Sequence, residues 1–407
     1  MLTDMSDVSF QNRAAKIQKL HKNLEKGIFR WKKQAFGLVI RKSSNFAPNY
    51  LNTSKVMAIE NYPNQRKKHC ETGTLLNMLK YYGYEGMSET MAFGIGSGFN
   101  FVYSPFLRMR GVKLPMFRIR PGLIAKNYCE RMGIGFHYEE FGNRVNKSMK
   151  ALDELVDKQI PVGLVVNVAR LHYFSPVVNE SNFNGHVLTV IGKEGSNYTI
   201  ADSDTRLTTD DYVFLTEDVM RKSRFVSGLA APHGKMFYID PLPKDFGENK
   251  DLKPAIIQGL EESCRRMLRV PVPFYGWTGL NCFARSLKMW KVWFSENLIG
   301  FILLWIYRLI ETTGTGGAGH RYMYADFLNE AAELFGSEVL ADCANLMTAD
   351  ADSWRQFSLD SRRYMKSDNI TLREMSELLE MIGQQEKRIF EKIDTEFLHS
   401  DLVRKYA

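Results

Sequence analysis

The hydrophobic pattern of the chain changes near residue 243, and this change limits the folds that the chain can adopt. Before it, short apolar runs typical of strands alternate with helical segments. After it, apolar residues recur at helical spacing only. We predict helices here over about 254–268, 279–310, 321–347, 350–365 and 371–398. The sequence therefore predicts an α+β domain with an antiparallel sheet, followed by an all-helical domain.

The chain of 407 residues is long for one hydrophobic core, so we expect several parts. We predict a basic N-terminal extension over 1–60, the α+β domain over 61–245 and a helical C-terminal domain over 246–407. The extension has a basic amphipathic pattern, which suits either a docking surface or a solvated helix packed on the body. The apolar run 298–307 is about half as long as a membrane-spanning helix. We expect a buried helix there and no membrane span.

Composition narrows the cellular setting and the partners. The five cysteines are scattered and show no CxxC or Cys/His spacing, so we expect neither a disulfide framework nor a metal site. This usage fits a reducing cytoplasm, and the polar N-terminus lacks a signal-peptide pattern. The net charge of +8 permits an acidic partner. No recognition motif accompanies the charge, so we expect no nucleic-acid partner.

Cys70 lies at the predicted start of a helix that Gly83 ends. The helical spacing is carried by Leu75, Leu76, Met78, Leu79 and Tyr82. Free backbone N–H groups and the helix dipole favour an anion at such a start, so we expect a lowered pKa for the Cys70 thiol. The hypothesis is that Cys70 is a nucleophile. The alternative is a packed, structural cysteine.

A thiolate nucleophile needs a base and a group that orients the base. Apolar strands over 185–192 and 198–202 flank a good turn, which predicts a hairpin. A hairpin places the start of one strand beside the end of the next, so His186 and Asp202 are candidates for base and orienting group. The rival bases are His69, His172 and His233.

Two glycine-rich segments are the remaining candidates. Gly96 and Gly98 follow no strand and precede one, which excludes a dinucleotide loop; they allow close approach to the Cys70 helix or to substrate. The loop 314–319 leads into Arg321 and suits either an anion site, such as a pantetheine phosphate, or a plain interhelical connection. For the oxyanion we expect the Cys70 backbone N–H and Gln65 as donors.

The order Cys, His, Asp, with the cysteine at a helix start, resembles papain-like cysteine enzymes. More closely, the chain resembles the butirosin biosynthesis protein H N-terminal domain family. That resemblance rests on 69–70, 77–83, 88–89 and 93–98, on Gly185-His186-Val187 and on the strand that ends at Asp202. The helical half is similar to the domain that accompanies this family, through 314–317 and 321–332.

The resemblance implies acyl transfer in secondary-metabolite biosynthesis, from a carrier-protein or coenzyme A thioester to an amine or hydroxyl acceptor. Cys70 would be acylated, His186 would move the proton and Asp202 would orient the His186 ring. The family often shows Asp-Pro, whereas Ser203 follows Asp202 here, so Asp204 is the alternative.

The implied donor carries its own phosphopantetheine, so the protein needs no bound cofactor. The implied partners are an acidic acyl carrier protein and a small-molecule acceptor; a homodimer is left open. A candidate basic patch for the carrier consists of Arg108, Arg110, Lys113, Arg118 and Arg120. The rival functions are a cysteine hydrolase on the same fold, either peptidase or thioesterase, and a non-enzymatic binding protein.

Overall fold

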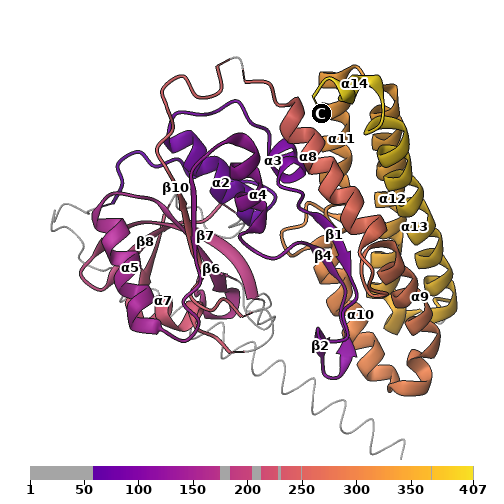
Figure 1. Ribbon diagram of the computed structural model, residues 1–407. Helices are drawn as coiled ribbons and strands as arrows, with labels where there is room; N and C mark the ends of the chain where they lie inside the picture. The colour runs from indigo at the N-terminus through magenta and orange to yellow at the C-terminus, as the bar shows by residue number, and fades with distance from the viewer. Residues whose placement is uncertain are drawn as a thin grey trace, which may run out of the picture. The chain divides into compact units, whose positions relative to one another are not determined.

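The computed structural model describes residues 58–174, 184–203, 212–227, 231–248, 250–367 and 369–406 (Figure 1). The predicted basic extension lies almost entirely outside these residues, as does Asp204. The chain from Val56 onward forms one compact unit. The predicted α+β class is confirmed, with antiparallel strands in the N-terminal part and helices in the C-terminal part. The predicted three-part division stays a prediction.

The main sheet has six strands, and all of its neighbouring pairs are antiparallel. Its spatial order is β5 (Phe136–Glu139), β10 (Met236–Ile239), β6 (Val162–Asn167), β7 (Asn184–Glu194), β8 (Asn197–Ala201) and β9 (Val213–Thr216). The predicted β7–β8 hairpin is confirmed: Glu194 pairs with Asn197, and Gly195 takes the left-handed φ that the tight turn requires.

The two faces of this sheet belong to different cores, because successive strand residues point to opposite sides. On β6 and β7, Leu164 and Leu188 pack in one core with α5 (Val145–Asp157) and α7 (Glu217–Arg224). Val165 and Val187 face the other core, which contains α2 (Cys70–Tyr81). The helix that carries Cys70 is therefore packed against the face of β7, the strand that carries His186.

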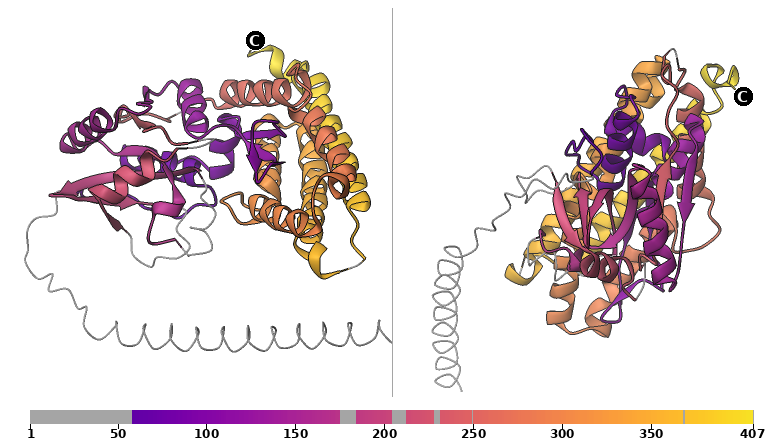
Figure 2. Two further views of the ribbon diagram at one scale, coloured as in Figure 1. Left: turned by 90° about the horizontal axis from the view of Figure 1, so that it is seen from below. Right: turned by 90° about the vertical axis from the view of Figure 1, so that its left-hand side faces the viewer.

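Short elements connect the sheet to the helical half. They are α3 (Glu89–Ile95), the ribbon of β1 (Phe99–Val102) and β4 (Met116–Arg118), the hairpin of β2 (Arg108–Met109) and β3 (Val112–Lys113), and α4 (Leu123–Met132). Ser88 caps α3, its hydroxyl accepting from the Met91 N–H at 3.0 Å. In Figure 2 (left), these indigo segments lie between the strands of the main sheet and the C-terminal helices.

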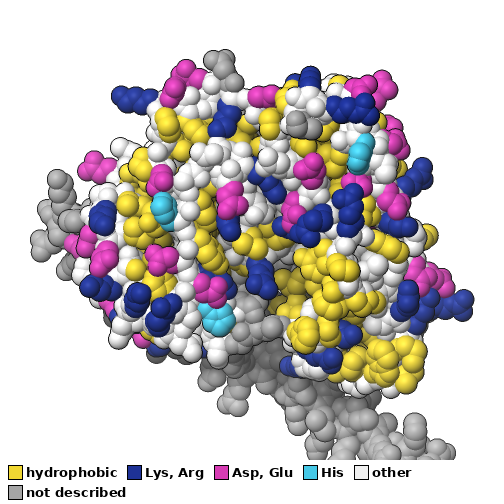
Figure 3. Space-filling model, in the orientation of Figure 1, with side chains coloured by type: hydrophobic (Ala, Val, Ile, Leu, Met, Phe, Trp, Pro, Cys, Tyr) yellow, Lys and Arg dark blue, Asp and Glu magenta, His cyan; other side chains and the backbone are white. Residues whose placement is uncertain are grey.

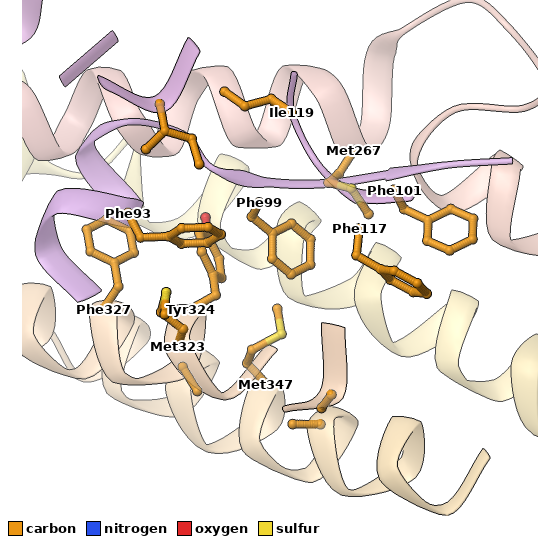
Figure 4. Packing of buried hydrophobic residues seen from close by; sticks show 14 of the residues in the cluster. Phe93, Phe99, Phe101, Phe117, Ile119, Met267, Met323, Tyr324, Phe327 and Met347 are labelled. Carbon is orange, nitrogen blue, oxygen red and sulfur yellow. The ribbon is translucent and has the colours of Figure 1, made fainter. Parts of the chain in front are cut away.

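The helical half consists of α8 (Lys253–Cys264), α9 (Gly276–Trp293), α10 (Glu296–Glu311), α11 (Arg321–Phe335), α12 (Glu338–Arg363), α13 (Leu372–Lys392) and α14 (Asp401–Arg404). Its core continues into the N-terminal part, where Phe93, Phe99 and Phe117 pack with residues of α11 and α12 (Figure 4). The rings of Phe99 and Tyr324 lie 4.6 Å apart. Both halves of the chain therefore share one hydrophobic core.

Two predicted helix boundaries were wrong. The segment 279–310 is two helices, because Phe294 and Ser295 are extended and Ser295 is the N-cap residue before α10. The break between α11 and α12 lies at Gly336 and Ser337, not near 348. Gly336 has a left-handed φ of 61°, and the Ser337 hydroxyl caps α12. The run 298–307 is a largely buried part of α10, and none of the described helices is long and apolar enough to cross a membrane.

Candidate active site

Cys70 is the first residue of α2, as the sequence predicted, and it is almost fully buried. His69 is the N-cap, and its Nδ1 accepts from the Thr72 N–H at 3.4 Å. The Glu89 carboxylate accepts from the backbone N–H groups of Lys68 and His69, at 3.0 and 2.7 Å. These hydrogen bonds therefore fix the backbone both before Cys70 and in the first turn of the helix after it.

His186 and Asp202 meet as the hairpin geometry predicted. Both side chains are buried, and Nε2 of His186 lies 2.6 Å from Oδ2 of Asp202. The other ring nitrogen, Nδ1, is not used by Asp202, and the Cys70 sulfur is near enough to the His186 ring to raise its pKa. The structure thus brings Cys70, His186 and Asp202 into one chain of contacts, from sulfur to imidazole to carboxylate.

The electrostatics of this chain favour a protonated imidazole. Burial by itself lowers the pKa of His186, but the Asp202 carboxylate and the Cys70 sulfur outweigh it, and the pKa is raised well above its ordinary value. A charged imidazole beside a carboxylate and a cysteine sulfur is the arrangement that a thiolate–imidazolium pair requires.

Tyr173 is a site residue that the sequence reasoning did not identify. Its hydroxyl donates to Oδ2 of Asp202 at 2.7 Å, so this oxygen accepts from both Tyr173 and His186. Burial and the neighbouring carboxylate raise the pKa of Tyr173 well above its ordinary value, which keeps the hydroxyl a donor. The next residue, Phe174, meets the His186 ring edge-on at 5.1 Å. The only sequence signal was this aromatic pair beside the loop residue His172.

A buried ion pair joins the Cys70 helix to the His186 strand. Arg118 on β4 donates to Oε2 of Glu71 at 2.8 Å and to the Gly185 carbonyl at 3.0 Å. The other Glu71 oxygen accepts from the backbone N–H groups of Ile124 and Ala125 at the start of α4. Arg118 therefore contacts the residue after Cys70 and the residue before His186. Because it is inside this network, Arg118 does not belong to the exposed basic patch that the sequence suggested.

Ser203 makes a second connection to Cys70. Its hydroxyl donates to the Cys70 carbonyl at 3.3 Å, and its own carbonyl accepts from the Lys67 N–H at 3.0 Å. Gly73 makes room for this contact, since a Cβ there would lie 2.3 Å from the Ser203 hydroxyl. The serine that stands where the family often has proline thus supplies a hydrogen bond that proline cannot make.

The other predicted site residues have packing or backbone contacts. The Gln65 side chain is exposed, and its backbone N–H and carbonyl are bonded to the Asn77 amide. Cβ atoms at Gly96 and Gly98 would clash with Ile124 and with the Phe93 ring. These two glycines allow the segment to pack against α4 and α3.

Arg321, predicted as a substrate-binding residue, is fully buried. Its guanidinium donates to Oε1 of Glu386 at 2.8 Å and to the Gly319 carbonyl at 2.7 Å. The Trp354 indole N–H donates to the same Glu386 oxygen. Arg321 therefore forms a structural ion pair with Glu386 and holds the glycine-rich loop through the Gly319 carbonyl.

His69, which precedes Cys70 in the chain, contacts a second buried histidine, His320. The His69 and His320 rings meet edge-to-face at 5.3 Å, and His320 also stacks on Phe93. Burial, followed by the nearby Arg118 charge, lowers the pKa of each well below its ordinary value. His69 is further committed to capping α2, and the rivals His172 and His233 are exposed and half-buried. Within the described ranges, no group of three His, Cys, Asp or Glu side chains is placed to hold a metal ion.

Comparison with known families gives two matches. Residues 69–203 match the family "Butirosin biosynthesis protein H, N-terminal", and 218–393 match a "Domain of unknown function (DUF4872)". The first match begins at His69 and ends at Ser203, so it contains Cys70, His186 and Asp202. No curated protein matches the chain significantly.

Proposed function

Because residues 69–203 belong to the butirosin biosynthesis protein H N-terminal family, an enzyme domain of biosynthesis, we propose that the protein is an acyltransferase. The reaction proceeds through a Cys70 acyl-enzyme. The donor is the thioester of an acyl carrier protein or of coenzyme A, and the acceptor is an amine or hydroxyl. The observation that carries the proposal is the buried contact chain of Cys70, His186 and Asp202, with a raised pKa at its centre.

In the first step, the Cys70 thiolate attacks the thioester carbonyl carbon of the donor. The carbon–sulfur bond to the carrier breaks, and the leaving thiolate takes the proton of the His186 imidazolium. One thioester replaces another, so little free energy is needed. The backbone N–H of Cys70 belongs to the helix start, where N–H groups lack partners within the helix, and it supplies one donor for the oxyanion. Gln65 remains the proposed second donor.

In the second step, the acceptor amine or hydroxyl attacks the acyl-enzyme. His186, now neutral, accepts the proton of the acceptor, and the Cys70 thiolate leaves. Asp202 and Tyr173 hold the imidazole during both steps through one shared carboxylate oxygen. The carrier would meet exposed basic side chains, among which Arg108, Arg110 and Arg120 remain available outside the Arg118 network.

Intact-protein mass spectrometry tests the proposal. The wild type and Cys70→Ala are incubated with a panel of acyl-carrier and acyl-coenzyme A thioesters, without acceptor. We expect an acyl-sized mass gain in the wild type that Cys70→Ala lacks. The matched control is Cys282→Ala, because Cys282 is the more exposed free thiol and its removal should leave the adduct unchanged.

Two outcomes would contradict the proposal. Full turnover by Cys70→Ala would exclude Cys70 as the nucleophile. An adduct that water removes as fast as any amine or hydroxyl acceptor would identify a hydrolase instead.

A further inference from the structure

Exposed apolar side chains gather at one end of the helical half. Among the described residues, ten large hydrophobic side chains are exposed, and six of them come from α9, α10, the segment 364–366 and the loop before β2. They are Phe106, Met289, Val292, Trp293, Leu304 and Met365, and we call them the apolar corner. The most exposed are Phe106 at 76%, Val292 at 73% and Trp293 at 56%. Monomeric proteins rarely expose such a group without a use for it.

Most members of the apolar corner lie on α10 or next to it: three end α9 just before α10 begins, Leu304 is on α10, and Met365 packs on Gly300 of α10. Met289, Val292 and Trp293 occupy one face of the last turns of α9, whose opposite face is buried through Leu287 and Trp290. Figure 3 shows hydrophobic side chains gathered at the lower right, over the lower ends of α9 and α10.

Two segments from elsewhere in the chain complete the corner. The short helical segment η4 (Tyr364–Lys366) packs on α10, where a Cβ at Gly300 would meet the Met365 side chain. The β2–β3 hairpin reaches the same helix, with the Arg110 guanidinium 4.0 Å from the centre of the Phe301 ring.

The segments that carry these apolar side chains are rich in basic residues. The segments 104–114, 285–297 and 361–367, which carry five of the six apolar residues, contain nine Lys and Arg but only one acidic residue, Glu296. Lys291 and the Tyr364 hydroxyl both contact Glu296, and Lys288 pairs with Glu380. Most of the other cations are exposed. These segments therefore combine exposed apolar side chains with an excess of exposed cations.

We propose that the apolar corner binds an anionic lipid surface. Exposed tryptophan, phenylalanine and aliphatic side chains enter the boundary between headgroups and acyl chains, while Lys and Arg contact anionic headgroups. A second copy of this chain fits less well, because a symmetric contact would place the same cations opposite one another. The proposal shares Arg108 and Arg110 with the basic side chains proposed to meet the carrier, but it does not depend on the chemistry at Cys70.

Vesicle co-sedimentation of the full chain tests the proposal. We expect the protein to sediment with phosphatidylserine–phosphatidylcholine vesicles, more weakly at high salt and weakly with phosphatidylcholine alone. The double variant Val292→Ser/Trp293→Ser should lower the affinity about tenfold or more. The charge variant Arg362→Glu/Arg363→Glu should lower it by a similar factor. The matched control is Phe214→Ser, since Phe214 is 58% exposed on the strand β9.

The same proteins also give the results that would contradict the lipid-binding proposal. Binding that the two double variants leave unchanged would overturn the proposal and assign lipid binding to another part of the chain. An absence of binding at low salt would also overturn it. A concentration-dependent dimer in size-exclusion chromatography that Val292→Ser/Trp293→Ser dissociates would show that a second copy covers the corner. Thermal melting of each variant confirms that it is folded.

Discussion

The guanidinium of Arg118 lies 2.8 Å from the carboxylate of Glu71, and this buried pair joins the two sides of the candidate active site. Glu71 follows Cys70 directly, and Arg118 also holds the carbonyl of Gly185, which precedes His186. The pair therefore fixes the backbone beside the sulfur and beside the imidazole without contacting either group in the reaction.

We predict that Arg118→Met slows Cys70 acylation about 10- to 100-fold and destabilises the fold by about 3–5 kcal/mol, because it leaves the Glu71 charge buried and unpaired. Arg118→Lys keeps the charge but loses the two-point donation, so its loss of stability should be smaller. Urea unfolding and acylation rates are measured together across pH. The control is the exposed Arg120→Lys. A positioning role predicts a lower rate with the pH profile unchanged, and a normal rate in folded Arg118→Met would contradict it.

Asp202→Asn should shift the pH dependence of acylation. Asp202 raises the pKa of His186, so its removal should lower that pKa and move the alkaline limb of the rate profile to lower pH. The rate itself should fall by about 10²- to 10⁴-fold, because the amide holds the imidazole less well. Tyr173→Phe is the milder comparison, since it removes one donor to the same oxygen and leaves the carboxylate. An unmoved alkaline limb in Asp202→Asn would exclude Asp202 as the partner that sets the His186 charge.

The His69–His320 pair should make the fold sensitive to acid. Both pKa values are lowered in the folded state, so below about pH 6.5 the unfolded chain binds protons that the folded chain does not. The free energy of unfolding should therefore fall with decreasing pH, by up to about 1.4 kcal/mol per pH unit for each histidine. His186 has the opposite sign, because its raised pKa adds stability below pH 6.5 that is lost as pH rises through the raised value.

Urea unfolding between pH 5 and 7.5 measures this slope, a range that brackets the ordinary histidine pKa of about 6.5. His320→Asn should reduce the slope, and asparagine tolerates the left-handed φ of 72° at this position. The comparison is His172→Asn, which removes a histidine from an exposed loop instead of a buried ring. An equal slope in the wild type and in His320→Asn would contradict the prediction.

Gly94→Ala should destabilise the protein by about 1–3 kcal/mol, because a Cβ there would lie 2.1 Å from the buried Phe327 ring of α11. Gly86→Ala is the matched control, since the nearest atom to its Cβ would be a Tyr84 ring carbon at 3.7 Å. The midpoints of denaturant unfolding report both variants. Similar midpoints for the two variants would show that α3 and α11 separate at little cost.

The part of the site that could be predicted from the sequence is the part set by local pattern. Helical spacing with a stop at Gly83 placed Cys70 at a helix start, and strand alternation with a turn at Gly195 brought His186 and Asp202 together. The fold class followed in the same way, from the change of pattern near residue 243.

The remaining features depend on contacts between distant segments. Nothing local distinguishes Arg118 from the exposed arginines near it, because its burial follows from Glu71, which is 47 residues away in the chain. Tyr173 likewise acts through a partner on another strand. The break at Gly336 was missed because the apolar spacing continues across it, although the glycine and the following serine are typical of a helix end and a helix start.

The contact of Phe99 with Tyr324 limits how this protein can be recombined. The two family matches divide the chain between 203 and 218, yet Phe99 lies in the first and Tyr324 in the second, and their rings share one core. A chimera joined at that border would set a ribbon shaped for one helical partner against the side chains of another. Any domain exchange therefore has to transfer the β1–β4 ribbon and α3 together with the helices. The parts of the chain that can be inherited or engineered separately do not coincide with the two sequence families.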